Sequence, residues 1–126
     1  MAERVRFEIF QDIQLLVEDF SETSHEELLQ TAASAREMIQ SQPPRSLRIL
    51  VLAYRPHIDV DTVRALKDTA TENAPFAMAT AVVGLDSFMK MLLKGVEVVS
   101  GRNFTPFDSE ELARKWLAEQ KPCPWS

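Results

Sequence analysis

The first two segments of the chain alternate between apolar and polar residues. Residues 5–10 and 13–18 both do so, and a period of two is typical of half-buried strands. In the second segment the alternation puts Glu18 on the polar face. Because only Gln11-Asp12 separates the segments, we predict a tight hairpin, although this pair is not the favoured Asn-Gly type.

A helical pattern follows the hairpin. Ser24 and Glu27 fit a capping box, in which the serine hydroxyl and the glutamate carboxylate each bind an unpaired backbone amide. A helix is predicted from there to about Ser41, before Pro43-Pro44. Its apolar stripe consists of Leu28, Ala32, Ala35 and Ile39.

Two apolar runs further along are too continuous for half-buried strands. Residues 47–53 indicate a central strand that is covered on both faces. Residues 76–83 are rich in alanine, and their short length and flanking Pro75 and Gly84 favour a strand over a helix. Between the two runs, a second helix is predicted from Asp59 or Asp61.

The last third of the chain predicts a helix, a short strand and another helix. The third helix ends at Gly101, and its expected inward residues are Leu85, Phe88, Met89, Leu92 and Val96. Residues 102–107 are predicted to form a short final strand, and Pro106 marks it as an edge or an end. The expected inward residues of the last helix are Leu112, Trp116 and Leu117. Its Glu110–Arg114 and Glu111–Lys115 spacings favour ion pairs on the outside.

The resulting order β-β-α-β-α-β-α-β-α predicts an α/β fold. Strands that alternate with helices form a sheet with a parallel centre, here preceded by an N-terminal hairpin. The 126 residues suit one domain, with a core over about 5–118 and an irregular tail over 119–126.

Composition narrows the class of protein. A formal net charge of −5 disfavours non-specific nucleic-acid binding. The single cysteine, Cys123, excludes an internal disulfide, and the spacing of His25 and His57 matches no familiar metal motif. The N-terminus has no apolar stretch of signal-peptide length, and no apolar run is long enough for a membrane-spanning helix. We expect a cytoplasmic protein without metal or cofactor.

Several segments together resemble the STAS group, the fold of anti-sigma-factor antagonists. The similarity covers about 7–117 and is closest to small stand-alone bacterial STAS/SEC14-like proteins. The segments that carry it are 47–53, 81–84, 100–104 and 107–117. The resemblance implies a single-domain STAS-like sandwich and a regulatory role in which the domain docks on a partner protein.

The phosphorylation switch of that group does not carry over. In the phosphorylated antagonists, a loop of the form Asp-Ser-Ser-Gly presents a serine to a kinase. Here the matching residues are Asp59, Val60, Asp61 and Thr62, and Val60 cannot accept a phosphate. Asp61 either mimics a permanently charged state or caps the helix.

The loop before the second helix is the first candidate site. It follows a buried strand and precedes a helix N-terminus, which is the usual place for a binding crevice in α/β sheets. An ordinary solvated connection would explain the same residues. The candidates for partner or ligand binding are Tyr54, Arg55, His57, Asp59, Asp61 and Thr62.

An apolar pocket under the third helix is the second candidate. Small residues on the 76–83 strand beneath a methionine-rich helix leave room for one, although core packing would also explain them. The candidates are Phe76, Met78, Phe88, Met89 and Leu92. Lys90, Lys94 and Arg102 form either a small basic cluster or a solvated helix face.

Three functions remain open at this stage. The first is a non-catalytic regulatory or protein-interaction module, with a homodimer possible through an edge strand. The second is a carrier or sensor of a small apolar, lipid-like ligand. An enzyme is disfavoured because neither histidine has an evident nucleophile partner and no phosphate-binding glycine loop is present.

Overall fold

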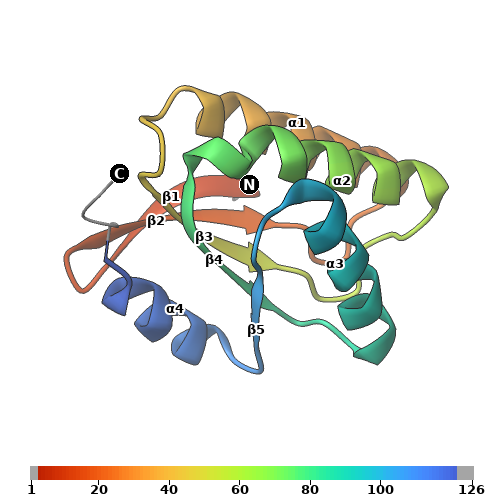
Figure 1. Cartoon of the computed structure of the whole chain (residues 1–126). Helices are drawn as coiled ribbons and strands as arrows, with labels where there is room; N and C mark the ends of the chain where they lie inside the picture. The colour runs from red at the N-terminus through yellow and green to blue at the C-terminus, as the bar shows by residue number, and fades with distance from the viewer. Residues whose placement is uncertain (1–2, 122–126) are drawn as a thin grey trace.

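The computed structural model describes residues 3–121 and contains one five-stranded sheet (Figure 1). The strands lie in the order β1-β2-β3-β4-β5, with β1 antiparallel to β2 and the other neighbours parallel. This confirms the predicted α/β fold with a hairpin and a parallel centre. The elements are β1 (Val5–Phe10), β2 (Ile13–Asp19), α1 (His25–Gln40), β3 (Leu47–Leu52), α2 (Val60–Asn73), a 3₁₀ turn (Ala74–Phe76), β4 (Ala77–Val83), α3 (Ser87–Ser100), β5 (Thr105–Phe107) and α4 (Glu110–Glu119).

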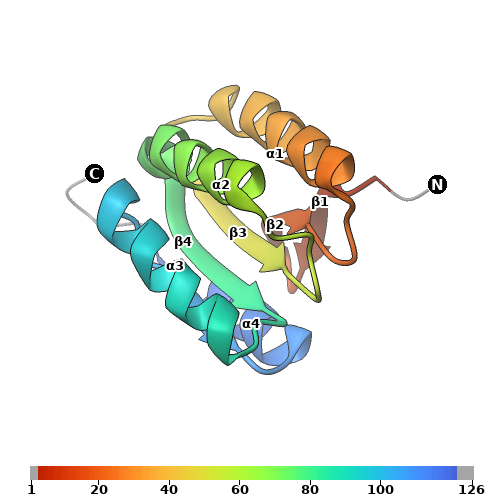
Figure 2. The ribbon, with the colours of Figure 1, turned by 90° about the vertical axis from the view of Figure 1, so that its right-hand side faces the viewer.

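Helices cover both faces of the sheet. In Figure 2, α1, α2 and α3 lie side by side on one face, and α4 lies on the other. Under α4, the core cluster contains Leu15, Val17, Leu50, Leu52, Ala81, Val83, Ala113 and Leu117. Under α1, a second cluster contains Val5, Leu16, Ala35, Ile39, Leu47 and Ile49. The sheet is therefore the central layer of three, and its middle strands are buried on both sides.

The hairpin turn has an unusual backbone. Gln11 and Asp12 have φ values of 50° and 65°, and a type I′ turn requires positive φ at both of these positions. Phe10 pairs with Ile13 across it. The predicted tight hairpin is therefore present without the Asn-Gly pair that usually forms it.

Two of the predicted helix starts show reciprocal side-chain capping. Ser24 caps α1 and forms the predicted box with Glu27. Asp59 rather than Asp61 caps α2, in a box with Thr62, so Asp61 lies in the first helical turn. The two predicted ion pairs of α4 are both present.

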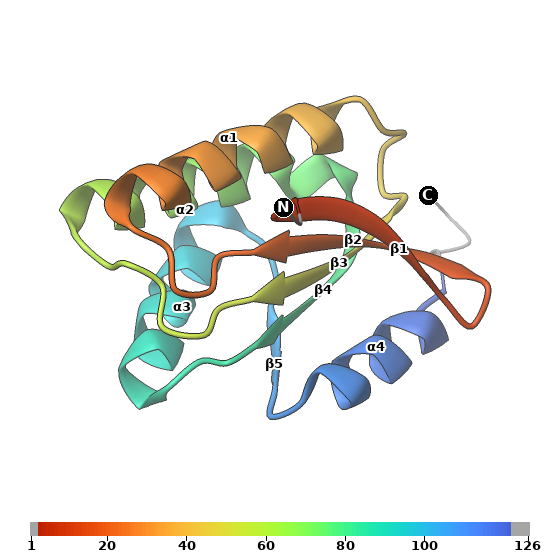
Figure 3. The same ribbon diagram turned by 180° about the vertical axis from the view of Figure 1, so that it is seen from behind.

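Two positions expected to face inward, and one on the apolar side of β1, are exposed. Ile9, which alternates with polar residues in β1, is 70% exposed, because it lies near the hairpin tip that projects beyond α1 (Figure 3). Phe88 of α3 is 58% exposed and Leu112 of α4 is 54% exposed. In α4, the buried stripe is centred on Ala113 and Leu117, and Leu112 lies about 100° around the helix from Ala113.

β2 differs more from its expected pattern. Leu15, Leu16, Val17 and Glu18 are all buried, so the central part of β2 is covered on both faces and is not half-buried. The alternation misled because β1 and β3 flank it and helices lie over both faces. Glu18 therefore faces the interior, where the sequence pattern predicted solvent.

In the described part of the chain, no helix is long and apolar enough to cross a membrane. The predicted tail begins within α4, which continues to Glu119. Residues 122–126, with Cys123, lie outside the described residues.

Candidate functional site

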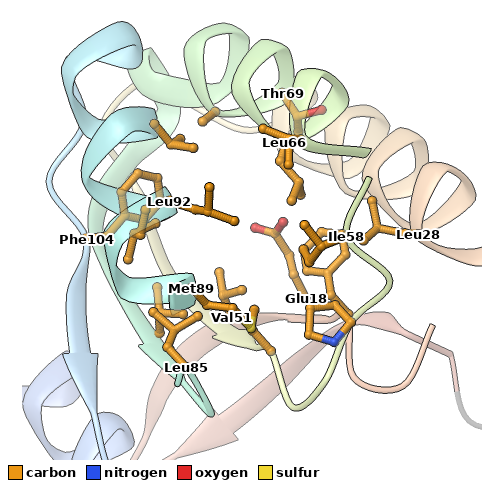
Figure 4. Close-up of a pocket in the computed structure, with 18 of the residues that line it drawn as sticks. Glu18, Leu28, Val51, Ile58, Leu66, Thr69, Leu85, Met89, Leu92 and Phe104 are labelled. Carbon is orange, nitrogen blue, oxygen red and sulfur yellow. The ribbon is translucent and has the colours of Figure 1, made fainter. Parts of the chain in front are cut away.

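An apolar cavity of about 120 Å³ lies between the sheet and the helices α2 and α3. Figure 4 shows it with Val51 of β3 below, Leu66 of α2 above and Leu92 of α3 at the side. Ile58, from the loop after β3, and Phe104, which precedes β5, also line it. The space remains because small side chains face it, namely those of Ala53, Ala70 and Val82.

Glu18 of β2 places a carboxyl group in this apolar cavity. Its side chain points into the space between the helices in Figure 4, and the residue is only 6% exposed. Burial raises the pKa of Glu18 from its ordinary 4.5 to about 7, against a smaller lowering by the charge of Arg102. No described residue forms a hydrogen bond with this carboxyl group. Burial therefore favours the protonated form of this carboxyl group.

Arg102 brings the second charged side chain to the cavity lining. Its Nη2 donates a hydrogen bond to Thr80 Oγ1 over 2.7 Å, and its guanidinium carbon lies 4.7 Å from the centre of the Phe104 ring. Burial lowers the pKa of Arg102, and the charge of Glu18 partly restores it. A guanidinium has five N–H donors, so it can bind a ligand while keeping the bond to Thr80.

The predicted pocket residues are distributed over four places. Met89 and Leu92 line the cavity. Phe76 packs against the cluster under α1, and Met78 is half-buried on β4 without lining the cavity. Phe88 lies in an outer groove between α2 and α3. The cavity therefore lies under the third helix, as hypothesised, but its lining differs in more than half of the named residues.

The two charged residues of the cavity were missed by sequence reasoning. The alternation in β2 predicts a polar strand face for Glu18, and the sequence places Arg102 with Lys90 and Lys94 in a basic cluster or on a solvated helix face. The unbroken apolar run Leu15-Leu16-Val17 was the available signal, because three consecutive apolar residues in a strand indicate burial on both faces. For Arg102 the sequence holds no comparable signal, since its direction depends on where α3 ends.

The residues of the predicted loop site also fall into two groups, of which the first does not converge. Tyr54 packs against Gly84, and Arg55 pairs with Glu22 at the surface. Asp61 is exposed in the first turn of α2. These three residues do not converge on one point.

His57, Asp59 and Thr62 do converge, and His25 from α1 joins them. Asp59 Oδ2 lies 2.7 Å from His25 Nδ1 and 2.7 Å from His57 Nε2. The other carboxylate oxygen, Oδ1, accepts a hydrogen bond from the backbone N–H of Thr62 over 2.8 Å. The two rings meet edge to face, with centres 5.8 Å apart.

This histidine cluster is a candidate for holding a metal ion. One ligand atom from each of His25, His57 and Asp59 lies within 4.8 Å of the others. The hydrogen bond to Asp59 raises the pKa of His25, and the bond from His25, followed by that from Thr62, holds the pKa of Asp59 well below its usual range. The sequence did not reveal the cluster because His25 and Asp59 are 34 positions apart.

No protein-family model matches this chain, and none of the curated proteins or solved structures is significantly similar to it. The function is therefore inferred from the geometry of the cavity and of the histidine cluster.

Proposed function

We propose that this protein binds a small apolar molecule carrying one polar group in the cavity between the sheet and α2 and α3, as a carrier or sensor without catalysis. The observation that carries the proposal is Glu18. This residue is only 6% exposed, its carboxyl group points into an apolar cavity, and no described residue forms a hydrogen bond with it. Burying such a group costs free energy, and a ligand that binds it would recover part of that cost.

The cavity volume limits the apolar part of the ligand. A cavity of about 150 Å³ lined by aliphatic and aromatic side chains can hold benzene, and this one measures about 120 Å³. One ring or a short branched chain therefore fits. Apolar pockets with a few converging polar groups are typical of small-molecule sites.

Arg102 and Glu18 together favour an acid as the polar group of the ligand. Arg102 attracts a carboxylate, and a protonated Glu18 can donate a hydrogen bond to it. An amine would pair with ionised Glu18 but would be repelled by Arg102. A weak acid with a compact apolar body satisfies both residues.

The side chains of the lining favour binding over catalysis. Besides Glu18 and Arg102, the described residues that line the cavity contribute one hydroxyl, from Thr69, and otherwise apolar side chains. A covalent mechanism needs a nucleophile within reach of a base.

Native mass spectrometry of the protein purified from its own host tests the proposal first. We expect a small molecule to be released at one per chain on gentle denaturation. As a second arm, benzoate, benzylamine and toluene are titrated into the ¹⁵N-labelled protein. Benzoate is expected to shift the amides around the cavity most strongly.

A matched pair of α2 variants assigns any binding to the cavity. Ala70 lines the cavity, whereas Ala65 faces a separate groove between α1 and α2. Ala70→Leu fills the cavity and should weaken benzoate at least tenfold, and Ala65→Leu should leave it unchanged. Bare protein from the host together with no binding of any probe, or equal binding by both variants, would contradict the proposal.

A second candidate function, docking on a protein partner, is favoured by the outer surface of α3. Phe88, Met91, Val98 and Val99 are all more than half exposed there, and Phe88 and Val99 share a groove with Val60 of α2. Exposed apolar groups gathered in this way are typical of interaction surfaces. The resemblance to STAS domains supports the same function.

Partner binding is tested by quantitative co-purification and sedimentation velocity of the wild type, Val99→Glu and Glu37→Lys. If α3 docks on a partner or on a second copy of the chain, Val99→Glu loses the complex. Glu37→Lys, a charge change at an exposed position of α1, keeps it. Loss in neither variant would exclude this surface.

A further inference from the structure

We propose that His25, His57 and Asp59 bind a divalent transition-metal ion of the Zn²⁺ class where α1 begins next to the loop that leads into α2. The proposal does not depend on a ligand in the cavity.

The geometry of the three side chains carries the inference. Both imidazole nitrogens already lie 2.7 Å from the same carboxylate oxygen, and all three ligand atoms fall within 4.8 Å of one another. Zinc binds such atoms at about 2.0–2.2 Å in a tetrahedron, which separates the ligands by roughly 3.3 Å. Admitting the ion requires the contacts to Asp59 to open by roughly 0.6 Å and the two imidazole nitrogens, at most 4.8 Å apart, to come to the same separation of roughly 3.3 Å. Rotations of these three partly exposed side chains provide such movements.

Helix capping alone does not explain the convergence. Asp59 caps α2 through Oδ1, which accepts the N–H of Thr62. The two histidines instead meet at Oδ2, the oxygen that the cap leaves free. They come from separate parts of the chain, and neither is needed for the cap.

The residues behind Asp59 hold it in place. Thr62 is completely buried, and its Oγ1 accepts a hydrogen bond from the N–H of Asp59 over 2.9 Å. The same hydroxyl lies 3.1 Å from the carbonyl oxygen of His57, to which it can donate. A supporting shell of this kind fixes the direction of ligand side chains and strengthens metal binding.

The ligand types define the class of ion. Imidazole suits zinc, copper, nickel and iron, whereas magnesium and calcium prefer oxygen ligands only. The side chains of His25, His57 and Asp59 are 36%, 44% and 34% exposed, so solvent can supply the remaining ligands. Two histidines and one carboxylate with an open position are known from zinc and non-haem iron sites.

The test uses untagged protein that carries Cys123→Ser, which removes the only thiol in the sequence. Isothermal titration with ZnCl₂ should give one ion per chain, and MgCl₂ at the same concentrations should give no binding. Co²⁺ should produce the visible absorption of a site with nitrogen ligands.

Variants assign the ion to the cluster. His25→Gln and His57→Gln should each weaken Zn²⁺ binding at least tenfold and abolish the rise in unfolding temperature that Zn²⁺ causes. Glu26→Gln, which changes an acidic neighbour of His25 outside the cluster, should bind within twofold of the parent protein.

Glutamine can still donate a hydrogen bond to Asp59, so circular dichroism of the metal-free variants should match the parent. If either variant fails to fold, the Co²⁺ spectrum of the parent protein decides, because it reports nitrogen ligands directly. The absence of stoichiometric Zn²⁺ binding, a Co²⁺ spectrum without nitrogen ligands, or unchanged affinity in both folded histidine variants would overturn the proposal.

Discussion

Gly84, which follows β4, lies directly against the ring of Tyr54. A Cβ atom at Gly84 would lie 2.8 Å from Tyr54 Cδ1 and 3.0 Å from the carbonyl carbon of Ala53. Gly84 also has a φ of 97°, a backbone conformation that residues other than glycine rarely adopt. The contact joins the ends of β3 and β4, beside the loop that borders the cavity.

Gly84→Ala should therefore destabilise the protein by about 2 kcal/mol or more, through the clash and the strained backbone. Gly95→Ala is the control, because Gly95 lies within α3 and a Cβ there meets no atom within 4 Å. That change should stabilise the protein by roughly 0.5–1 kcal/mol. Urea unfolding measures both free energies, and effects of the same sign would contradict the contact.

Val82 and Val83 are neighbours on β4 that face opposite layers. Val82 lines the cavity, and Val83 lies in the close-packed cluster under α4. Val82→Ile should stabilise the protein by about 0.8 kcal/mol, because it buries one more methylene in free space. Val83→Ile should cost roughly 1–3 kcal/mol through overpacking. Thermal unfolding compares the two variants, and a loss of stability in Val82→Ile would mean that the cavity is closed to added volume.

Leu112 and Leu117 provide a similar comparison within α4. Leu117 is completely buried, whereas Leu112 is 54% exposed. Leu117→Ala should lower the free energy of unfolding by about 2–5 kcal/mol, and Leu112→Ala by less than about 1 kcal/mol. Equal losses in denaturant titrations would mean that α4 is rotated from its described position.

Glu18 should make stability depend on pH. Its pKa is about 7 in the folded protein and 4.5 as the ordinary value, so between these values the folded chain holds more protons than the unfolded chain. Stability from this residue is present below pH 4.5 and is lost as pH rises through 7, by about 3 kcal/mol.

Glu18→Gln removes the titrating group and should flatten this decline. Urea unfolding at pH 5, 6, 7 and 8 measures the difference between wild type and variant, in which other titrating groups largely cancel. Parallel profiles for the two proteins would show that Glu18 ionises as an ordinary surface carboxylate.

The order of strands and helices was predictable from local patterns. The continuous apolar run of residues 47–53 indicated the central strand, and Ser24 with Glu27 indicated the start of α1. Such signals depend on neighbours within one or two turns of chain, so they are present in the sequence itself.

The wrong predictions of burial share one cause, which is packing between elements that are distant in the sequence. Glu18 was expected to face solvent, and Phe88 and Leu112 to face the core. Burial of Glu18 depends on which helices cover that position of the sheet, and burial of Phe88 and Leu112 depends on how α3 and α4 are rotated against it. No local period contains this information.

By itself, the sequence determined the α/β class, the order of the elements and the hairpin at the start, because hydrophobic periodicity and capping act over a few residues. Only the tertiary structure decided that Glu18 and Arg102 line one apolar cavity and that His25 meets His57 at Asp59. These residues are brought together by parallel strands and crossover helices, which place distant parts of the chain side by side.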